Sequence, residues 1–183
     1  LPVLLGGVLK MSKSKNNVVE PRAFISRFGA DTARVFTMFA GPPDQSAAWS
    51  DSGAEGAYRF LRRLWATAHA SRDRVMAAGD ALTTSAPSAA AQNLRRDVHT
   101  VLRQIDADYA RLQYNTVISG AMKLLNAIDA AALPPSPADD AVLREAFSIL
   151  IRTLYPAAPH ITHALWGGLG FDRDGGSDLP FAP

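Results

Sequence analysis

Three lysines and two serines lie close together near the start of the sequence, in a run whose side chains suit the binding of phosphate. The run is Lys10-Met11-Ser12-Lys13-Ser14-Lys15, followed by Asn16-Asn17. Lysine ammonium groups act as flexible point charges, and their bonds to phosphate oxygens strengthen as negative charge builds during a reaction. The chemistry indicated is electrostatic stabilisation of a polyphosphate. The same composition also fits a solvated basic loop, which is what most charge runs are.

The order of these residues resembles a known enzyme signature. Lys-Met-Ser-Lys-Ser at residues 10–14 is similar to the signature loop of class I aminoacyl-tRNA synthetases. Other parts of the chain resemble the bacterial leucyl-tRNA synthetases, namely residues 16–17, 20–21, 28–34, 49–53, 55–57, 59–63, 94–99, 114–116, 159–161 and 165–166. These segments keep the order of the family from about residue 4 to residue 169, so the resemblance covers most of the chain.

The resemblance implies a role for each residue of the loop. In the family, this loop closes over ATP and stabilises the α-phosphate and the leaving pyrophosphate while the aminoacyl-adenylate forms. Carried onto this chain, the resemblance makes Lys13 the contact to the ATP phosphates and Lys10 a second, weaker electrostatic contributor. Met11, Ser12 and Ser14 would shape the loop and add backbone or hydroxyl contacts to ATP. It gives no firm role to Lys15.

Composition narrows the class of protein. The 183 residues are 48% hydrophobic and 20% charged, which excludes a disordered chain and allows a substantial core. The sequence has no cysteine, so a disulfide framework, a thiolate metal site and a cysteine nucleophile are excluded. It has no apolar run near the roughly 18 residues that a membrane helix needs, and we expect no membrane partner.

The net charge of +2 conceals an uneven distribution. Residues 1–50 carry six cations and three anions, and residues 59–74 carry five arginines and one aspartate. From residue 129 onward, three cations face seven anions. A basic first half and an acidic end indicate an anionic partner at one end only.

Helical periodicity dominates the chain after residue 20. We expect short helices at residues 21–28 and 30–40, with Gly29 ending the first, followed by longer amphipathic helices. No strand alternation is sustained, which predicts a mainly α protein built as an antiparallel helix bundle. The resemblance implies that the bundle is an anticodon-binding domain of the class I synthetase type, preceded by stem-contact helices. The expected domains are residues 1–50 at the end of a catalytic domain, residues 51–169 in the bundle, and a loosely held tail at 170–183.

Two expectations concern the first long helix. Ser52 and Glu55 have the spacing of a capping box, which predicts a helix start at Ser52. Trp65 belongs to an apolar stripe, which predicts that it is buried with the other members, Ala57, Phe60, Leu61 and Leu64. We therefore expect the tryptophans to pack between elements rather than to stack on bases; they are Trp49, Trp65 and Trp166.

Arginines on the long helices are candidates for contacts with RNA phosphates. Arg59, Arg62 and Arg63 lie off the apolar stripe, and Arg95 and Arg96 form a second cluster. Such contacts give salt-dependent affinity without reading the base sequence. A solvated surface explains the arginines equally well, as do salt bridges to Asp97, Asp106 or Asp108. The resemblance implies tRNA(Leu) as the partner and the bundle as a platform for the body of the tRNA.

Two histidines near the end of the chain invite other interpretations. His160 and His163 look like the family's His-x-Gly-His signature, but Thr162 replaces the glycine and the segment follows the lysine loop instead of preceding it. As a metal-binding pair they lack a third ligand, so we expect no metal site. We expect the pair to have a structural role in a helix after Pro159.

The leading hypothesis is a part of a bacterial leucyl-tRNA synthetase. The full enzyme would activate leucine with ATP and Mg²⁺ and transfer it to tRNA(Leu), as a monomer in the cytoplasm. The chain starts at Leu1 without an initiator methionine, and we expect it to be an inactive piece of a longer protein. One alternative is a free-standing tRNA-binding or scaffold module. The other is a valyl, isoleucyl or methionyl relative, which Asn16-Asn17 and residues 52–63 argue against.

Overall fold

Helices make up the regular structure of the chain. The computed structural model describes residues 10–47, 49–78, 86–172 and 179, and the side chain of Lys13 lies outside this description. The elements in these residues are the 3₁₀ turn η1 (Lys13–Lys15) and the helices α1 (Pro21–Phe28), α2 (Ala30–Phe39), α3 (Asp51–Ala78), α4 (Ala89–Ala110), α5 (Tyr114–Ala130), α6 (Pro137–Leu154) and α7 (Pro159–Gly168). Because no strand occurs in the described part of the chain, the predicted mainly α class is confirmed.

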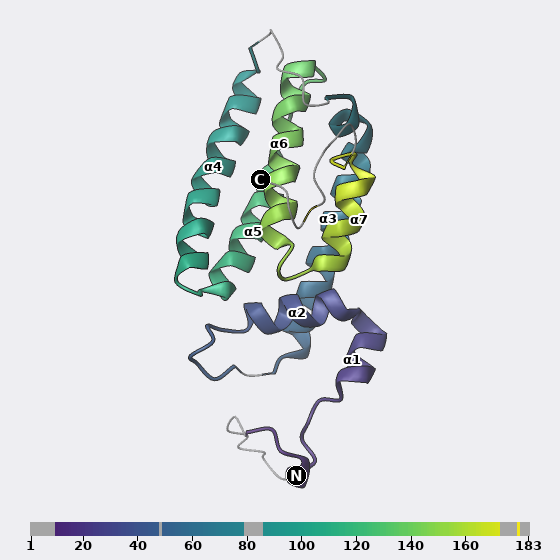
Figure 1. Cartoon of the computed structure of the whole chain (residues 1–183), viewed down its shortest axis with the longest axis vertical. Coiled ribbons are helices and arrows are strands. Elements are labelled where there is room, and N and C mark those ends of the chain that lie inside the picture. The colour runs from purple at the N-terminus through teal and green to yellow at the C-terminus, as the bar shows by residue number, and fades with distance from the viewer. Residues whose placement is uncertain (1–9, 48, 79–85, 173–178, 180–183) are drawn as a thin grey trace, which may run out of the picture.

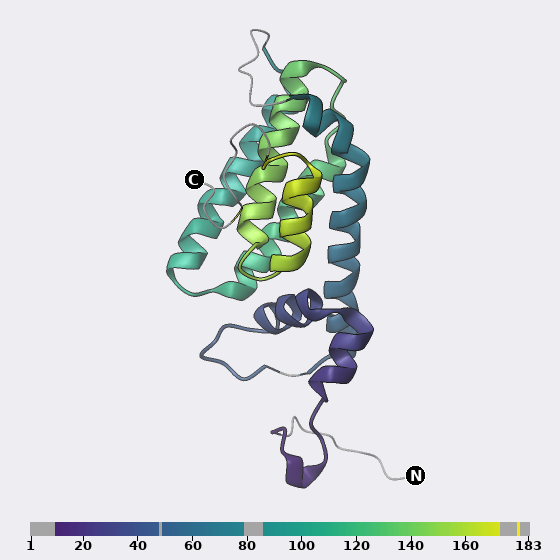
Figure 2. The same ribbon diagram turned by 45° about the vertical axis from the view of Figure 1, so that its right-hand side comes forward.

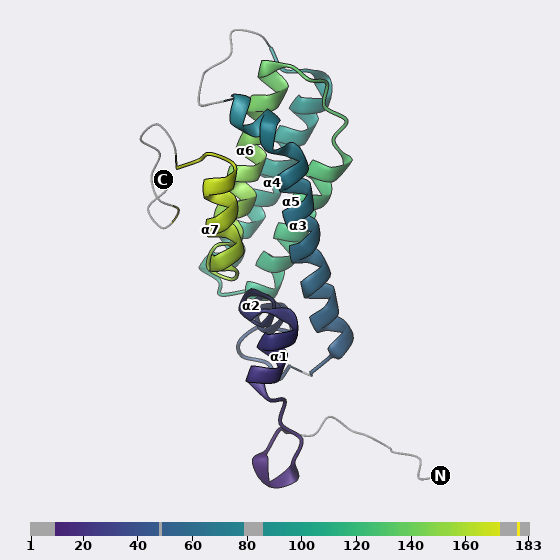
Figure 3. The ribbon, with the colours of Figure 1, turned by 90° about the vertical axis from the view of Figure 1, so that its right-hand side faces the viewer.

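Four of the helices form an antiparallel bundle. Figure 1 shows α3, α4, α5 and α6 running along the long axis of the molecule, and Figure 3 shows α7 on one side of them. Helix α6 is the central element, because it packs against α3, α4, α5 and α7. Its side chains Phe147, Leu150, Ile151 and Leu154 are fully buried. The predicted bundle architecture is therefore confirmed.

Helices α1 and α2 form the foot of the molecule. Helix α2 lies across the lower ends of the bundle helices, and α1 leads down from it to the lysine loop (Figures 1 and 2). Gly29 forms the corner between them with a φ of 86°, and its N–H donates to the carbonyl of Ile25, so the predicted end of the first helix is confirmed. An aromatic cluster holds the corner against α3, with ring pairs Phe24–Phe28, Phe24–Phe36, Phe24–Trp49, Phe36–Trp49 and Phe28–Tyr58.

The first long helix begins earlier than its capping pattern predicted. Helix α3 starts at Asp51, and the hydroxyl oxygen of Ser50 accepts the N–H of Gly53 at 3.1 Å. The capping serine is therefore Ser50, and the predicted start at Ser52 is wrong. Both serines carry a suitable oxygen, so spacing alone does not distinguish them. The carboxylate of Glu55 faces Arg27 of α1 instead of its own helix start.

Tertiary contacts also set the start of α4. Ser88 caps this helix by accepting the N–H of Ala91, and its own N–H and hydroxyl both donate to Asp139 of α6. The helix thus includes residues 89–93, which precede Leu94, the first buried leucine of its apolar face. Asp139 is 1% exposed, so the cap is part of the core.

Helices α4 and α5 approach each other closely at Gly120. A Cβ atom at Gly120 would lie 2.6 Å from Cγ1 of Ile105, whereas one at Gly56 of α3 would find its nearest neighbour 4.0 Å away. We expect Gly120→Ala to lower the free energy of unfolding by about 1–3 kcal/mol through overpacking. The matched change Gly56→Ala should raise it by about 0.5–1 kcal/mol, because alanine favours the helix. Urea unfolding checks both, and a Gly120→Ala variant as stable as the wild type would refute the steric reading.

A second stability prediction concerns the effect of pH on Asp108, in the last turn of α4. Burial of the Asp108 carboxyl acts to raise its pKa, but hydrogen bonds from Arg111, Thr116 and Gln104 outweigh burial and lower the pKa below 3.8. The folded state therefore binds this proton more weakly than the unfolded state, and the carboxylate stabilises the fold above that pH. We expect the wild type to be more stable than Asp108→Asn at neutral pH.

This difference should shrink as the pH falls through the lowered pKa of Asp108. Urea unfolding measured over a pH series gives the difference at each pH, and Asp97→Asn at an exposed position of α4 serves as the control. A difference that stays constant down to the lowest pH would contradict the assignment.

Candidate functional site

The lysine loop is closed on itself by the side chain of Asn17. Its carbonyl oxygen Oδ1 accepts the N–H of Ser12 at 2.8 Å, and its Nδ2 donates to the carbonyl of Lys10 at 3.3 Å. Within this clasp, the hydroxyls of Ser12 and Ser14 lie 2.7 Å apart, and the N–H of Lys15 donates to the carbonyl of Ser12. An amide side chain can do this because it has both a donor and an acceptor. The loop therefore has internal hydrogen bonds that fix its shape.

The residues predicted to meet ATP lie together on this loop. Lys10, Met11, Ser14 and Lys15 are exposed, and Ser12 is half-buried. In the described part of the chain, neither Lys10 nor Lys15 forms an ion pair. The backbone of Lys13 opens η1, but its side chain lies outside the described residues, so its predicted contact with phosphate stays a prediction. No role was predicted for Asn17. The features that could have indicated one are its amide side chain and its position directly after the lysines.

The five predicted RNA-facing arginines fall into two groups. Arg63 is bound to Asn126 and lies 3.4 Å from Asp129, and Arg95 lies 2.8 Å from Glu145. Both side chains are therefore already held, although by other acids than the sequence analysis considered.

The remaining three predicted arginines are exposed. Arg59, Arg62 and Arg96 have no ion pair within the described residues, and Arg62 lies over the ring of Tyr58 at 5.9 Å. Arg59 and Arg62 both lie on α3 above the foot, where the helix passes α1 and α2. Of the five predicted arginines, these three are available to an external anion within the described residues.

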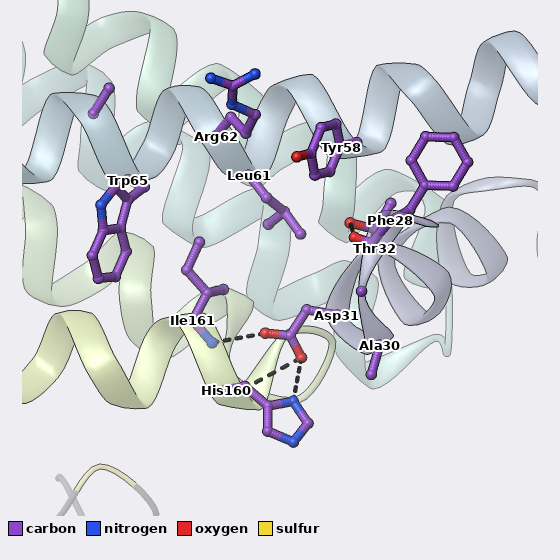
Figure 4. Close-up of a pocket in the computed structure, with 12 residues that line it drawn as sticks. Phe28, Ala30, Asp31, Thr32, Tyr58, Leu61, Arg62, Trp65, His160 and Ile161 are labelled. Carbon is purple, nitrogen blue, oxygen red and sulfur yellow. Dashed lines mark hydrogen bonds and ion pairs between the residues drawn. The ribbon is translucent and has the colours of Figure 1, made fainter. Parts of the chain in front are cut away.

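An open groove of about 640 Å³ runs between α3, the start of α2 and the start of α7 (Figure 4). Arg62 and Trp65 of α3 line one side, and His160 and Ile161 of α7 line the other. Trp65 is 48% exposed, so the prediction that it is buried is wrong: its position at the edge of the apolar stripe places it over the groove. Trp49 packs against aromatic rings, and Trp166 is buried and stacked on Phe171, which agrees with the packing expected for both.

The carboxylate of Asp31 closes the lower end of this groove. Its Oδ2 accepts the N–H of Ile161 at 2.7 Å, and its Oδ1 accepts the N–H of His160 at 3.4 Å (Figure 4). Oδ1 also lies 2.7 Å from Nδ1 of His160. Because an ionised carboxylate only accepts hydrogen bonds, Nδ1 carries the hydrogen in this contact. His160 therefore has the structural role that was expected.

Arg34 forms a second contact between α2 and the bundle. Its Nη2 donates to the carbonyl of Pro156 at 2.7 Å, and its Nε donates to the carbonyl of Ala157 at 3.1 Å. Asp31 and Arg34 lie one helical turn apart; Asp31 binds the start of α7, and Arg34 binds the link between α6 and α7. We call these two residues and their partners the junction. Sequence reasoning had placed both residues only in a segment of family resemblance, because their partners lie more than 120 residues away.

The described residues show no sign of two other classes of site. No group of three or more histidine, aspartate or glutamate side chains there could hold a metal ion. Of the helices described, none is both long and apolar enough to cross a membrane.

The second half of the chain matches a known domain family. Residues 91–177 match the model described as the anticodon-binding domain of tRNA ligase. This region comprises α4 to α7 apart from the first two residues of α4. The second half of the bundle is thus similar to the anticodon-binding domain of the tRNA ligases, the class of protein that this match indicates.

Whole-chain comparisons show which tRNA ligases the chain is similar to. The leucine–tRNA ligase of Methylibium petroleiphilum is 66% identical over 182 residues, which are 100% of this chain and 20% of that protein. Those of Janthinobacterium sp. and Bordetella pertussis are 54% and 55% identical, each over 97% of this chain. The chain therefore spans about a fifth of the length of the curated relatives it matches. It is a leucine–tRNA ligase homologue, and the predicted resemblance to the bacterial leucyl-tRNA synthetases is confirmed.

A solved structure supports the same assignment. The ternary complex of an Agrobacterium radiobacter K84 LeuRS with tRNA and LeuAMS superposes with a TM-score of 0.80 at 26% sequence identity. The match covers 95% of this chain and 22% of that chain. The relatives and this structure are all named for leucine, so they do not support the valyl, isoleucyl or methionyl alternatives.

Proposed function

We propose that this chain is the part of a leucine–tRNA ligase that supplies the ATP-phosphate loop and a tRNA-docking helical domain. The observation that supports this most directly is the combination of an exposed, self-clasped lysine loop with a bundle of the tRNA-ligase type in one homologous segment. Residues 1–50 would complete the catalytic domain and residues 51–169 would dock the tRNA. In the full protein, acting as a cytoplasmic monomer, these parts would serve the joining of leucine to tRNA(Leu).

The loop would act on the first half of the reaction. There, a carboxylate oxygen of leucine attacks the α-phosphorus of ATP, and the bond to the bridging oxygen breaks as pyrophosphate leaves. Negative charge on the phosphate oxygens rises in the transition state, and ammonium groups held nearby stabilise that state more than bound ATP. We assign this to Lys13, with Lys10 as a weaker contributor, while Met11, Ser12 and Ser14 shape the loop. Mg²⁺ would enter as part of the nucleotide substrate.

The clasp by Asn17 adds a physical reason for this assignment. A loop that must order itself around ATP loses part of its binding energy to the cost of ordering. Here the backbone between Lys10 and Asn17 is already joined by two side-chain hydrogen bonds, so less of that cost remains. The lysines are thus presented on a preformed turn at the foot of the bundle.

The bundle would act on the second half of the reaction. A ribose hydroxyl oxygen of the tRNA attacks the carbonyl carbon of leucyl-adenylate, the bond to the phosphate oxygen breaks, and AMP and a proton leave. For this step the tRNA must be held in place, and we assign backbone contacts to the exposed arginines, Arg59, Arg62 and Arg96. Arg63 and Arg95, which the sequence analysis included, would first have to leave their acidic partners.

The test of the loop is Lys13→Ala in the full-length protein. We expect leucine-dependent ATP–pyrophosphate exchange to fall roughly 100-fold, as for the loss of one preorganised donor to a transition-state oxygen. The KM for leucine should change little, because Lys13 is assigned to phosphate. Lys15→Ala is the matched control and should stay within about threefold of the wild type. A Lys13→Ala rate near that of the wild type would show that the catalytic assignment of Lys13 is wrong.

The test of the bundle is the salt dependence of tRNA binding. We expect weak binding of tRNA(Leu) that falls as salt rises, and Arg59→Ala, Arg62→Ala and Arg96→Ala should each reduce the slope of log affinity against log salt by about 1. Arg95→Ala is the control for Arg96→Ala, because the neighbouring arginine is held by Glu145. Fluorescence anisotropy with labelled tRNA gives these slopes. Binding that does not depend on salt would leave the bundle with a structural role only.

A further inference from the structure

At the junction, each charged side chain of α2 lies against a helix end of opposite partial charge. Asp31 presents its carboxylate to the first N–H groups of α7, where the helix dipole is positive. Arg34 presents its guanidinium to carbonyls just beyond the end of α6, where the dipole is negative. The planar guanidinium tolerates few alternative orientations when it donates to two carbonyls. These contacts therefore fix the direction of α2 as well as its position.

Helix α7 has no cap of its own. Its N-cap residue Ala158 makes no side-chain hydrogen bond to the helix, and Pro159 is its first residue. The N–H groups of His160 and Ile161 are instead satisfied by Asp31, about 130 residues earlier in the chain. The side chain of Asp31 is only 11% exposed, so water competes little for these bonds. The start of α7 and the start of α2 are thus parts of one interaction.

The lysine loop is connected to the junction by a short and packed path. Residues 18–20 alone separate Asn17 from the start of α1, and Gly29 alone separates α1 from α2. Phe24 and Phe28 of α1 pack on rings from α2 and α3, so α1 cannot rotate freely about the corner. A change in the direction of α2 would therefore change where the loop lies relative to the bundle.

We propose that Asp31 and Arg34 are positioning residues that hold the lysine loop and the tRNA-docking bundle in a fixed mutual orientation. This proposal rests on the function proposed above. Activation of leucine requires the loop and ATP, whereas transfer also requires a tRNA docked on the bundle to reach the adenylate. Loosening the junction therefore slows transfer much more than activation. A residue that only stabilised the fold would reduce both steps together.

The test compares the two steps in the same preparation of full-length protein. We expect Asp31→Ala and Arg34→Met to lower the ratio of kcat/KM for tRNA in leucyl-tRNA formation to the rate of pyrophosphate exchange by roughly tenfold, since small misplacement of reactants is costly. This ratio does not depend on the fraction of protein that is folded. Asp31→Asn should recover much of it, because the amide oxygen still accepts from Ile161.

The control for this ratio is Glu55→Gln. It removes an acid from the exposed pair with Arg27, which joins α1 to α3 outside the junction, and should leave the ratio unchanged. The proposal is overturned if the junction variants lower both activities equally, or if Glu55→Gln lowers the ratio as much as they do.

Hydrogen exchange tests the junction without any activity. In Asp31→Ala we expect backbone amides of residues 21–39 and 159–168 to exchange roughly tenfold faster, while those of α4 keep their wild-type rates. Unchanged exchange in residues 21–39 would mean that α2 is held without Asp31, and would overturn the proposal. If the wild-type protein shows no leucine-dependent exchange of pyrophosphate, the proposed function fails, and the amide rates still decide whether the junction holds α1 and α2.

Discussion

A carboxylate and a guanidinium of α2, one helical turn apart, bind backbone groups at the start of α7 and in the link between α6 and α7. Asp31 takes the place of a missing N-cap, and Arg34 satisfies two carbonyls that follow α6. The foot and the bundle are separate along the chain, and these bonds join them together with the packing of α2 against α3 and α5. The groove above the junction, the corner at Gly29 and the placement of the lysine loop all depend on the direction that α2 takes.

The arginines of this molecule fall into two groups according to their partners. Arg34, Arg74 and Arg144 each donate to main-chain carbonyls, and Arg144 is 8% exposed while it reaches Val75, Leu169 and Gly170. Such residues close helix ends that would otherwise leave acceptors unsatisfied in the interior. The exposed arginines of α3 and α4 that have no such partner in the described part of the chain form the second group. The arginines available to an RNA are therefore fewer than the arginines in the chain.

Local signals predicted the helices well, because they depend on neighbours in sequence. The corner at Gly29 followed from residue type and spacing. Contacts across the chain were beyond such signals. Trp65 was expected in the core because its helix stripe is apolar, but its side chain at the edge of that stripe is 48% exposed. Which arginines are held was not predictable either, since Asp129 and Glu145 approach them from other helices.

The length of α3 means that a small tilt at one end of the helix produces a large displacement at the other. Its 28 residues extend about 42 Å, from contacts with α1 at the foot to the opposite end of the bundle. A rigid rod of that length behaves as a lever, and a tilt of about 5° at its lower end displaces its upper end by about 4 Å. That displacement exceeds the length of a hydrogen bond. Because α2 packs against α3, the direction that Asp31 and Arg34 give to α2 also bears on the tilt of this long helix.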